Sequence, residues 1–120
     1  MAIVNKTIDD SATGTGSAGD YEVELLNVPA DKTYAITTVM VCNPNVPSGE
    51  TLNFDLHFIP AGDSLDVLKT AVVRSLSLPA GETFTFDSEK IVLSENDRLV
   101  VFGAPVNGDA LSATVSYLEV

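Results

Sequence analysis

Residues 32–60 read KTYAITTVMVCNPNVPSGETLNFDLHFIP, from Lys32 to Pro60, and this stretch decides the fold class. Its first part, residues 32–43, is dense in β-branched and apolar residues without helical spacing, which predicts a long strand with some burial on both faces. Its second part, residues 51–59, alternates strictly. The prolines and glycine of residues 43–49 cannot continue either strand, so the sequence predicts a hairpin with a long loop.

The alternation in residues 51–59 assigns each side chain to a face. One set is apolar and is expected in the core: Leu52, Phe54, Leu56 and Phe58. The other set is polar and is expected to face water: Asn53, Asp55 and His57. A strand with one apolar and one polar face is typical of an antiparallel sheet whose outer side is solvated.

The rest of the chain repeats this pattern in short strands separated by turns. Strands are expected near residues 2–8, 20–28, 70–78, 83–86, 90–93, 98–102 and 110–120. Residues 90–102 are expected to form a second hairpin, and Asn107-Gly108 predicts a tight hairpin turn. No amphipathic helix could cover a sheet, so the sequence predicts an all-β fold, a single antiparallel β-sandwich of about eight strands, either jelly-roll or immunoglobulin-like.

The domain division follows from a change in composition. Residues 9–20 are rich in Gly, Ser, Thr and Asp and contain no side chain that could fill a core. We therefore expect residues 1–19 to form an extended N-terminal arm with a flexible segment, and residues 20–120 to form the sandwich. An arm of this kind suits addition as a strand to a neighbouring subunit.

Charge and cysteine content narrow the function classes. The formal net charge of −11 argues against a nucleic-acid partner, because binding to phosphates requires Lys and Arg. The single Cys42 cannot form an internal disulfide and is expected to be a small buried hydrophobic residue. No apolar stretch approaches the length of a membrane span. The first residues do not resemble a signal peptide.

Three groups of residues resemble catalytic or binding sites, and each has a simpler interpretation. His57 and Asp55 are two residues apart and resemble an oriented general base, but the sequence offers no third member, so we interpret them as a surface pair. Gly14-x-Gly16-x-x-Gly19 matches a dinucleotide fingerprint in spacing, yet it precedes a strand instead of a helix. Candidate calcium ligands are Asp9-Asp10, Asp63 with Asp66, Asp87 with Glu89, and Glu95 with Asp97; none repeats the pattern of a dedicated loop. We predict no catalytic, cofactor-binding or metal-binding residues, no cofactor and no enzymatic activity.

Five segments, in order, resemble a known group of proteins. They are Val28–Asn43, Phe58–Gly62, Leu76–Thr83, Ile91–Leu99 and Ala113–Val120. This order resembles small β-sandwich virion proteins of tailed bacteriophages, which decorate capsids or contribute to necks and tails. The resemblance covers about residues 28–120 and leaves the N-terminal arm unmatched.

The resemblance implies a non-enzymatic structural protein of the virion, assembled in the host cytoplasm. Its expected role is a capsid decoration or cement protein that contacts the major capsid protein, as a homo-oligomer with a trimer among the options. Two alternatives remain: a neck, tail or baseplate accessory or fibre protein, and a carbohydrate-binding adhesin domain. Against the adhesin, the chain has no Trp, and most of its 5 Phe and 3 Tyr fall on positions expected in the core.

Overall fold

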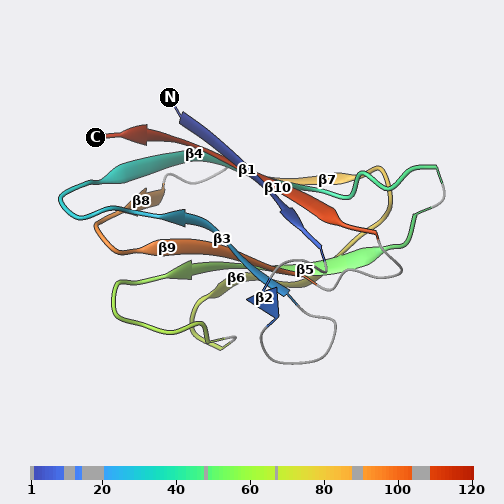
Figure 1. The fold of residues 1–120 in the computed structure, drawn as a ribbon, viewed down its shortest axis with the longest axis horizontal. Coiled ribbons are helices and arrows are strands. Elements are labelled where there is room, and N and C mark those ends of the chain that lie inside the picture. The colour runs from blue at the N-terminus through green and yellow to red at the C-terminus, as the bar shows by residue number, and fades with distance from the viewer. Residues whose placement is uncertain are drawn as a thin grey trace.

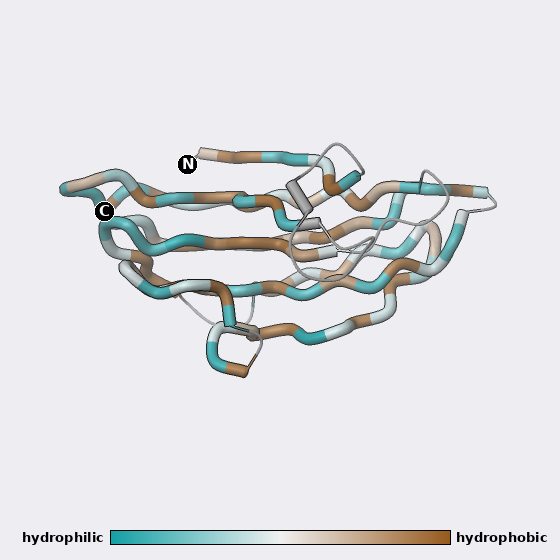
Figure 2. Tube along the Cα trace, turned by 60° about the horizontal axis from the view of Figure 1, so that its bottom comes forward, coloured by the Kyte–Doolittle hydropathy of each residue, from teal (hydrophilic) through white to brown (hydrophobic). Residues whose placement is uncertain are grey.

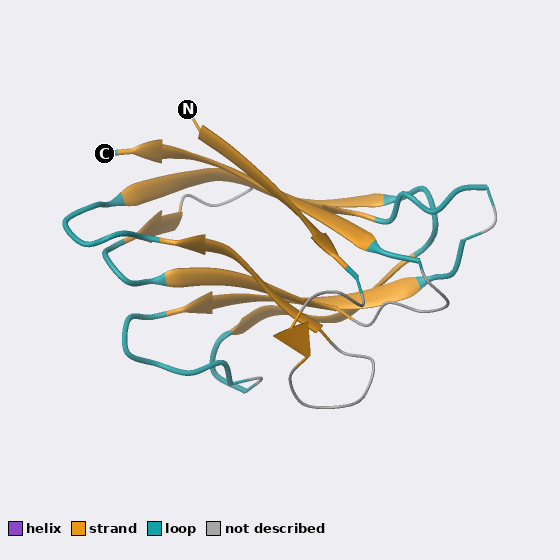
Figure 3. Ribbon diagram, in the orientation of Figure 1, coloured by secondary structure: helices purple, strands orange, loops and turns teal. Residues whose placement is uncertain are grey.

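The computed structural model describes residues 2–9, 13–14, 21–47, 49–66, 68–87, 91–103 and 109–120. Within these residues the chain forms ten β-strands and no helix (Figure 3). The strands are β1 (Ala2–Ile8), β2 (Thr13–Gly14), β3 (Tyr21–Asn27), β4 (Tyr34–Cys42), β5 (Leu52–Ile59), β6 (Ala71–Leu78), β7 (Thr83–Phe86), β8 (Ile91–Leu93), β9 (Arg98–Gly103) and β10 (Leu111–Glu119). No described helix could therefore cross a membrane.

The strands form two five-stranded antiparallel sheets that pack face to face (Figure 1). Sheet A has the order β1-β10-β4-β7, and β8 pairs with β4 further along the same strand. Sheet B has the order β2-β3-β9-β5-β6. The predicted all-β antiparallel sandwich is therefore confirmed.

The pairing order shows which kind of sandwich this is. The chain turns back on itself between β5 and β6, and each earlier strand then pairs with a later one: β4 with β7 and β8, β3 with β9, and β1 with β10. These antiparallel pairs form one long ribbon, and the ribbon is rolled up so that β10 also pairs with β4 in sheet A and β9 also pairs with β5 in sheet B. A ribbon rolled in this way is a jelly roll, which decides between the two predicted topologies.

The core lies between the sheets and is built from the alternating positions that the sequence indicated. Leu52, Phe54 and Leu56 of β5 are buried, and Phe58 packs against them. Two tilted aromatic pairs join the sheets, Phe54 with Phe84 and Phe58 with Phe86. Figure 2 shows the hydrophobic and hydrophilic residues alternating along the strands. The predicted apolar face of residues 52–58 is therefore confirmed.

The predicted hairpin of residues 32–60 is wrong. β4 lies in sheet A and β5 lies in sheet B, and the two strands do not pair. Each has an apolar inner face, and placing the strands in opposite sheets lets these faces cover each other. The connection is fixed at Asn43, whose buried side-chain amide donates to the carbonyls of Glu50 and Leu78, both at 2.8 Å.

The predicted hairpin of residues 90–102 is wrong for the same reason. β8 pairs with β4 in sheet A, whereas β9 pairs with β3 and β5 in sheet B. The turn between them is bonded to Val28, whose N–H donates to the Asp97 carbonyl and whose carbonyl accepts from Asn96. The turn at Asn107-Gly108 lies outside the described residues, and the strands on either side of it, β9 and β10, belong to different sheets.

The first strand belongs to the sandwich, contrary to the expected arm. β1 pairs with β10 along its whole length, from Ala2 opposite Tyr117 to Ile8 opposite Leu111. The Ile8 side chain is buried in the core because the inner face of sheet A would otherwise end at β10. The expected boundary at residue 19 therefore does not separate residues 2–8 from the sandwich. Most of the segment rich in small residues lies outside the described residues.

Candidate functional site

The expected surface pair of His57 and Asp55 is buried, which corrects the prediction. The exposed fraction of His57 is 0% and that of Asp55 is 7%. β5 lies inside sheet B between β9 and β6, and the chain that follows it returns to Thr70, which contacts its outer side. The backbones of β5 and Thr70 are also hydrogen-bonded, because the Phe58 N–H donates to the Thr70 carbonyl at 3.2 Å. Asn53, at the other end of β5, is exposed as expected.

The hydrogen bonds around Thr70 indicate which ring nitrogen of His57 carries the proton. The Thr70 hydroxyl donates to the Asp66 carbonyl at 2.9 Å and accepts from the Asp66 N–H at 3.1 Å. Its proton is therefore engaged, so it acts as the acceptor for Nδ1–H of His57 at 2.8 Å. The second ring nitrogen, Nε2, then carries the lone pair and has no hydrogen-bond partner.

Burial keeps the His57 imidazole neutral near pH 7. Burial lowers the pKa of His57 from its ordinary value of 6.5, and the nearby Asp55 carboxylate, 3.7 Å from Nε2, opposes this only in part. Asp55 is itself engaged with β6. One of its oxygens accepts the Ser75 N–H at 2.6 Å, and the other lies 3.6 Å from Nε of Arg74.

This cluster has the geometry of a structural support. A histidine that activates a hydroxyl must accept that hydroxyl's proton, but the Thr70 proton points to a carbonyl. The contacts instead attach Thr70, with its partner Asp66, and β6 to the outer side of β5. The sequence pattern missed Thr70 because it lies 13 positions from His57, and no local spacing indicates that contact.

Three of the acids considered as calcium ligands accept hydrogen bonds from backbone N–H groups in turns. Asp97 accepts from the N–H groups of Ala61 and Ser94, at 2.8 and 2.9 Å. Glu95 accepts from the Asp31 N–H at 2.8 Å, and Asp66 accepts from the Leu68 N–H at 2.9 Å. Among the described residues no three acidic, His or Cys side chains group as metal ligands. Four residues of these candidate sites lie outside the described part of the chain: Asp10, Gly16, Gly19 and Glu89.

The outer face of sheet A is built from small hydroxyl and amide side chains. The register places these residues outward in rows across β1, β10, β4 and β7: Asn5, Thr7, Thr38, Thr83, Thr85, Ser112, Thr114 and Ser116, with Ile3, Ala35, Met40, Cys42 and Leu118 among them. We call these residues the hydroxyl face. Cys42 is half-buried here, so its expected position inside the core is wrong.

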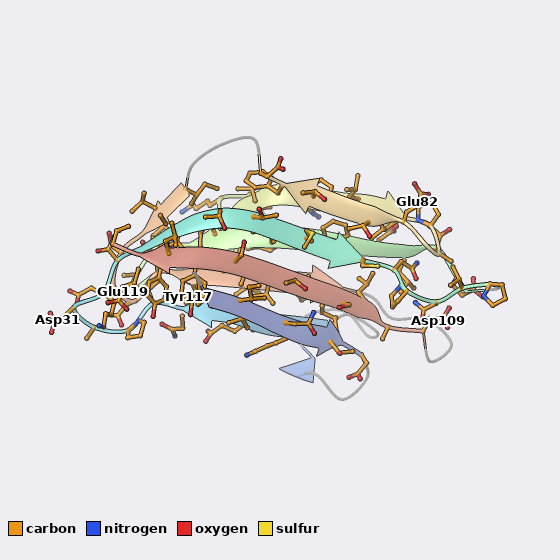
Figure 4. All side chains as sticks on the ribbon, turned by 90° about the horizontal axis from the view of Figure 1, so that it is seen from above. Asp31, Glu82, Asp109, Tyr117 and Glu119 are labelled. Carbon is orange, nitrogen blue, oxygen red and sulfur yellow. The ribbon has the colours of Figure 1, made fainter. Side chains whose placement is uncertain are left out.

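The hydroxyl face carries no charged side chain within the described residues. Lys6 and Glu119 are the only charged residues of the five strands of sheet A. Lys6 occupies an inward position and its ammonium donates to the Glu24 carbonyl at 2.9 Å, while Glu119 is paired with Lys32 at the end of β10. Figure 4, which looks down on sheet A, shows the labelled acids at its two ends.

The outer face of sheet B differs in charge. Its strands carry Glu22 and Glu24 on β3, Arg98 on β9 and Arg74 on β6. Arg98 lies 3.6 Å from Glu24, and Arg74 lies at the same distance from Asp55. The two outer faces of one sandwich therefore have opposite character, one uncharged and the other ionic.

Six of the eight aromatic side chains are paired in the sandwich, and Phe102 is half-buried on the outer face of sheet B. Tyr34 stacks on Tyr117 with ring centroids 4.4 Å apart, and the four Phe residues of β5 and β7 form the two tilted pairs described above. Rings that pack against another ring in this way do not present a flat face to a sugar. This arrangement favours a packing role over a role in stacking carbohydrate.

Comparison with known proteins gives little further information. No protein-family model matches the chain, and no curated protein matches it in sequence. One solved structure, that of the infectious bursal disease virus Gx strain, is similar at 18% identity with a TM-score of 0.41. The similarity covers 97% of this chain and 32% of that one, so this chain spans about a third of its length. A TM-score below 0.5 is too low to inform the function.

Proposed function

We propose that this protein is a non-enzymatic structural component of a virus particle, and more specifically a decoration protein of a tailed-phage capsid. The observation that carries the proposal is the outer edge of β1, which pairs with no strand of the described residues and could accept a strand from a neighbouring subunit. Such an edge presents unpaired N–H and C=O groups that bind an added strand. The jelly-roll fold and the resemblance of residues 28–120 agree with this role by analogy.

The four sheet edges of the described residues are not equally protected. β2, β7 and β8 are short, with 2, 4 and 3 residues. β6 is long, but its pairing with β5 is interrupted by two register shifts, and it carries Arg74. Short strands, bulges and charges are the features that prevent strands from adding to an edge. β1 is longer than three of these strands, and its seven residues pair with β10 without a shift. Its one charged side chain, Lys6, donates to the Glu24 carbonyl at 2.9 Å.

Ile3 is the residue to change, since it is an apolar side chain on this edge with 68% of its surface exposed. We expect Ile3→Lys to lower the occupancy of the protein on its particles, because a lysine on an edge strand opposes strand addition. Val72→Lys is the matched control, since Val72 is an apolar residue on the other long edge and 47% exposed. Occupancy is measured by quantitative mass spectrometry of purified particles, and equal occupancy of both variants would contradict the role of β1.

Copy number separates the decoration role from the neck or tail alternative. A decoration protein is present in hundreds of copies, because many modest contacts to a repeating shell act together. A neck or tail subunit is present in a small multiple of six. Counting the wild-type chain in the same particles distinguishes the two, and its absence from the particles would end the proposal.

A further inference from the structure

The hydroxyl face contrasts with the overall charge of the chain. The sequence carries a formal net charge of −11, yet this face has no charged side chain among its described positions. Solvated sheet faces normally carry charges that keep copies of a protein apart. A wide uncharged face on an acidic protein is therefore the surface through which two copies can meet with the least repulsion.

Several polar groups of the hydroxyl face already bond to one another. The Asn5 amide donates to the hydroxyls of Ser112 and Thr114, at 3.1 and 2.7 Å. The Ser116 hydroxyl bonds to the hydroxyl of Thr37, the neighbour of Thr38 on β4, at 2.6 Å. Covering a polar group is costly only when it loses its hydrogen bonds to water without replacement. Covering this face therefore costs less than its polar composition suggests.

We propose that the hydroxyl face binds the same face of a second copy of this chain, forming a two-fold symmetric dimer. The second copy is the occupant that matches this surface, because it offers another uncharged face whose polar groups are bonded within their own sheet. A two-fold contact uses the same patch on both subunits. Methyl groups of threonine and the exposed side chains of Met40 and Ile3 supply the apolar contacts.

The size of the face is sufficient for a weak dimer. The strands β1, β10, β4 and β7 have 7, 9, 9 and 4 residues. At about 3.3 Å a residue and about 4.8 Å between strands, they give a projected area of about 460 Å². Two copies would then bury about 900 Å² in total, which is below the range of stable specific interfaces and typical of weak, transient contacts. The expected dimer is therefore weak, with a dissociation constant between about 100 μM and about 1 mM.

Charges at the ends of the face predict how salt acts. Figure 4 shows Asp31 and Glu119 at one end of sheet A and Glu82 and Asp109 at the other. Two stacked copies bring such acids near one another, and salt screens repulsion over about 8 to 10 Å. The dimer should therefore strengthen as the salt concentration rises, which is the opposite of an interface held by ion pairs.

The experiment is sedimentation equilibrium of the full chain at low and high salt. We expect reversible dimerisation that strengthens with salt. Met40→Glu and Thr85→Glu each place a carboxylate within the contact and should weaken dimerisation at least tenfold. Val72→Glu is the matched control in sheet B and should leave it unchanged. Circular dichroism identifies any variant that fails to fold, and the two face variants lie on different strands, so one can replace the other.

Three results would overturn the proposal. The first is a monomer at about 1 mM at every salt concentration, and the second is weakening by salt. The third is that the face variants do not weaken the dimer more than Val72→Glu does. Either result of this kind, an equal loss in all variants or no loss in the face variants, would indicate pairing through a sheet edge instead. These outcomes concern the purified chain alone, so they are distinguishable from failure of the virion role.

Discussion

The two outer faces of the sandwich start from similar sequence patterns and end in different environments. On sheet A the outward positions of β10, Ser112, Thr114 and Ser116, stay at the surface. On sheet B the outward positions of β5, Asp55 and His57, are buried by the chain that returns to Thr70. Alternation therefore assigns a side chain to one side of a sheet, but a connecting segment decides whether that side is in water.

The largest expected effect concerns whether β1 completes sheet A. Ile8→Ala should destabilise the protein by about 3 kcal/mol, because it leaves a cavity under the edge of the sheet. Ile3→Ala, on the exposed side of the same strand, should change stability by less than about 0.5 kcal/mol. Chemical denaturation measures both. Equally small effects would mean that residues 2–8 form the detached arm that the sequence suggested.

The same substitution on each face measures the contrast directly. Thr70→Val should cost about 2 kcal/mol, because it leaves Nδ1–H of the buried His57 and the Asp66 N–H without their acceptor. Thr85→Val should cost less than about 0.5 kcal/mol, since Thr85 is exposed on β7. Urea denaturation of both variants is the measurement. Equal costs would remove the distinction between a covered face and an open one.

A smaller effect is expected in the pH dependence of stability. Burial lowers the pKa of His57 in the folded state below 6.5, so the unfolded chain binds a proton first as the pH falls. His57 thus adds no pH dependence above about pH 7, and stability is lost as the pH falls from 6.5 toward the folded pKa. The loss from one group is at most about 1.4 kcal/mol per pH unit.

The control for this prediction is His57→Gln, which retains an amide donor and does not titrate. Three other charged groups act on the imidazole, Asp55 from β5, Glu22 from β3 and Arg74 from β6, and all three remain in the variant. The urea midpoint of the variant should fall less than that of the wild type between pH 6.5 and 5.5. Parallel curves would show that His57 is not the group that titrates.

Local pattern predicted the elements of this fold more reliably than their partners. A strand imposes side-chain alternation wherever it lies. This alternation predicted the apolar face of residues 52–58 and the strands at residues 70–78 and 83–86. The hairpins at residues 32–60 and 90–102 were wrong, because a turn sequence does not record whether the next strand continues the same sheet or crosses to the other.

The sequence by itself determined that this protein is an all-β sandwich, that β5 contributes its apolar side to the core, and that the molecule is strongly acidic. Alternation and composition are properties of neighbouring residues, so they can be recognised without a structure. Only the tertiary structure decided the jelly-roll order, the burial of His57 against Thr70 and the grouping of hydroxyl side chains on one uncharged face. These features depend on strands that are distant in the chain, and long-range pairing leaves no local trace in the sequence.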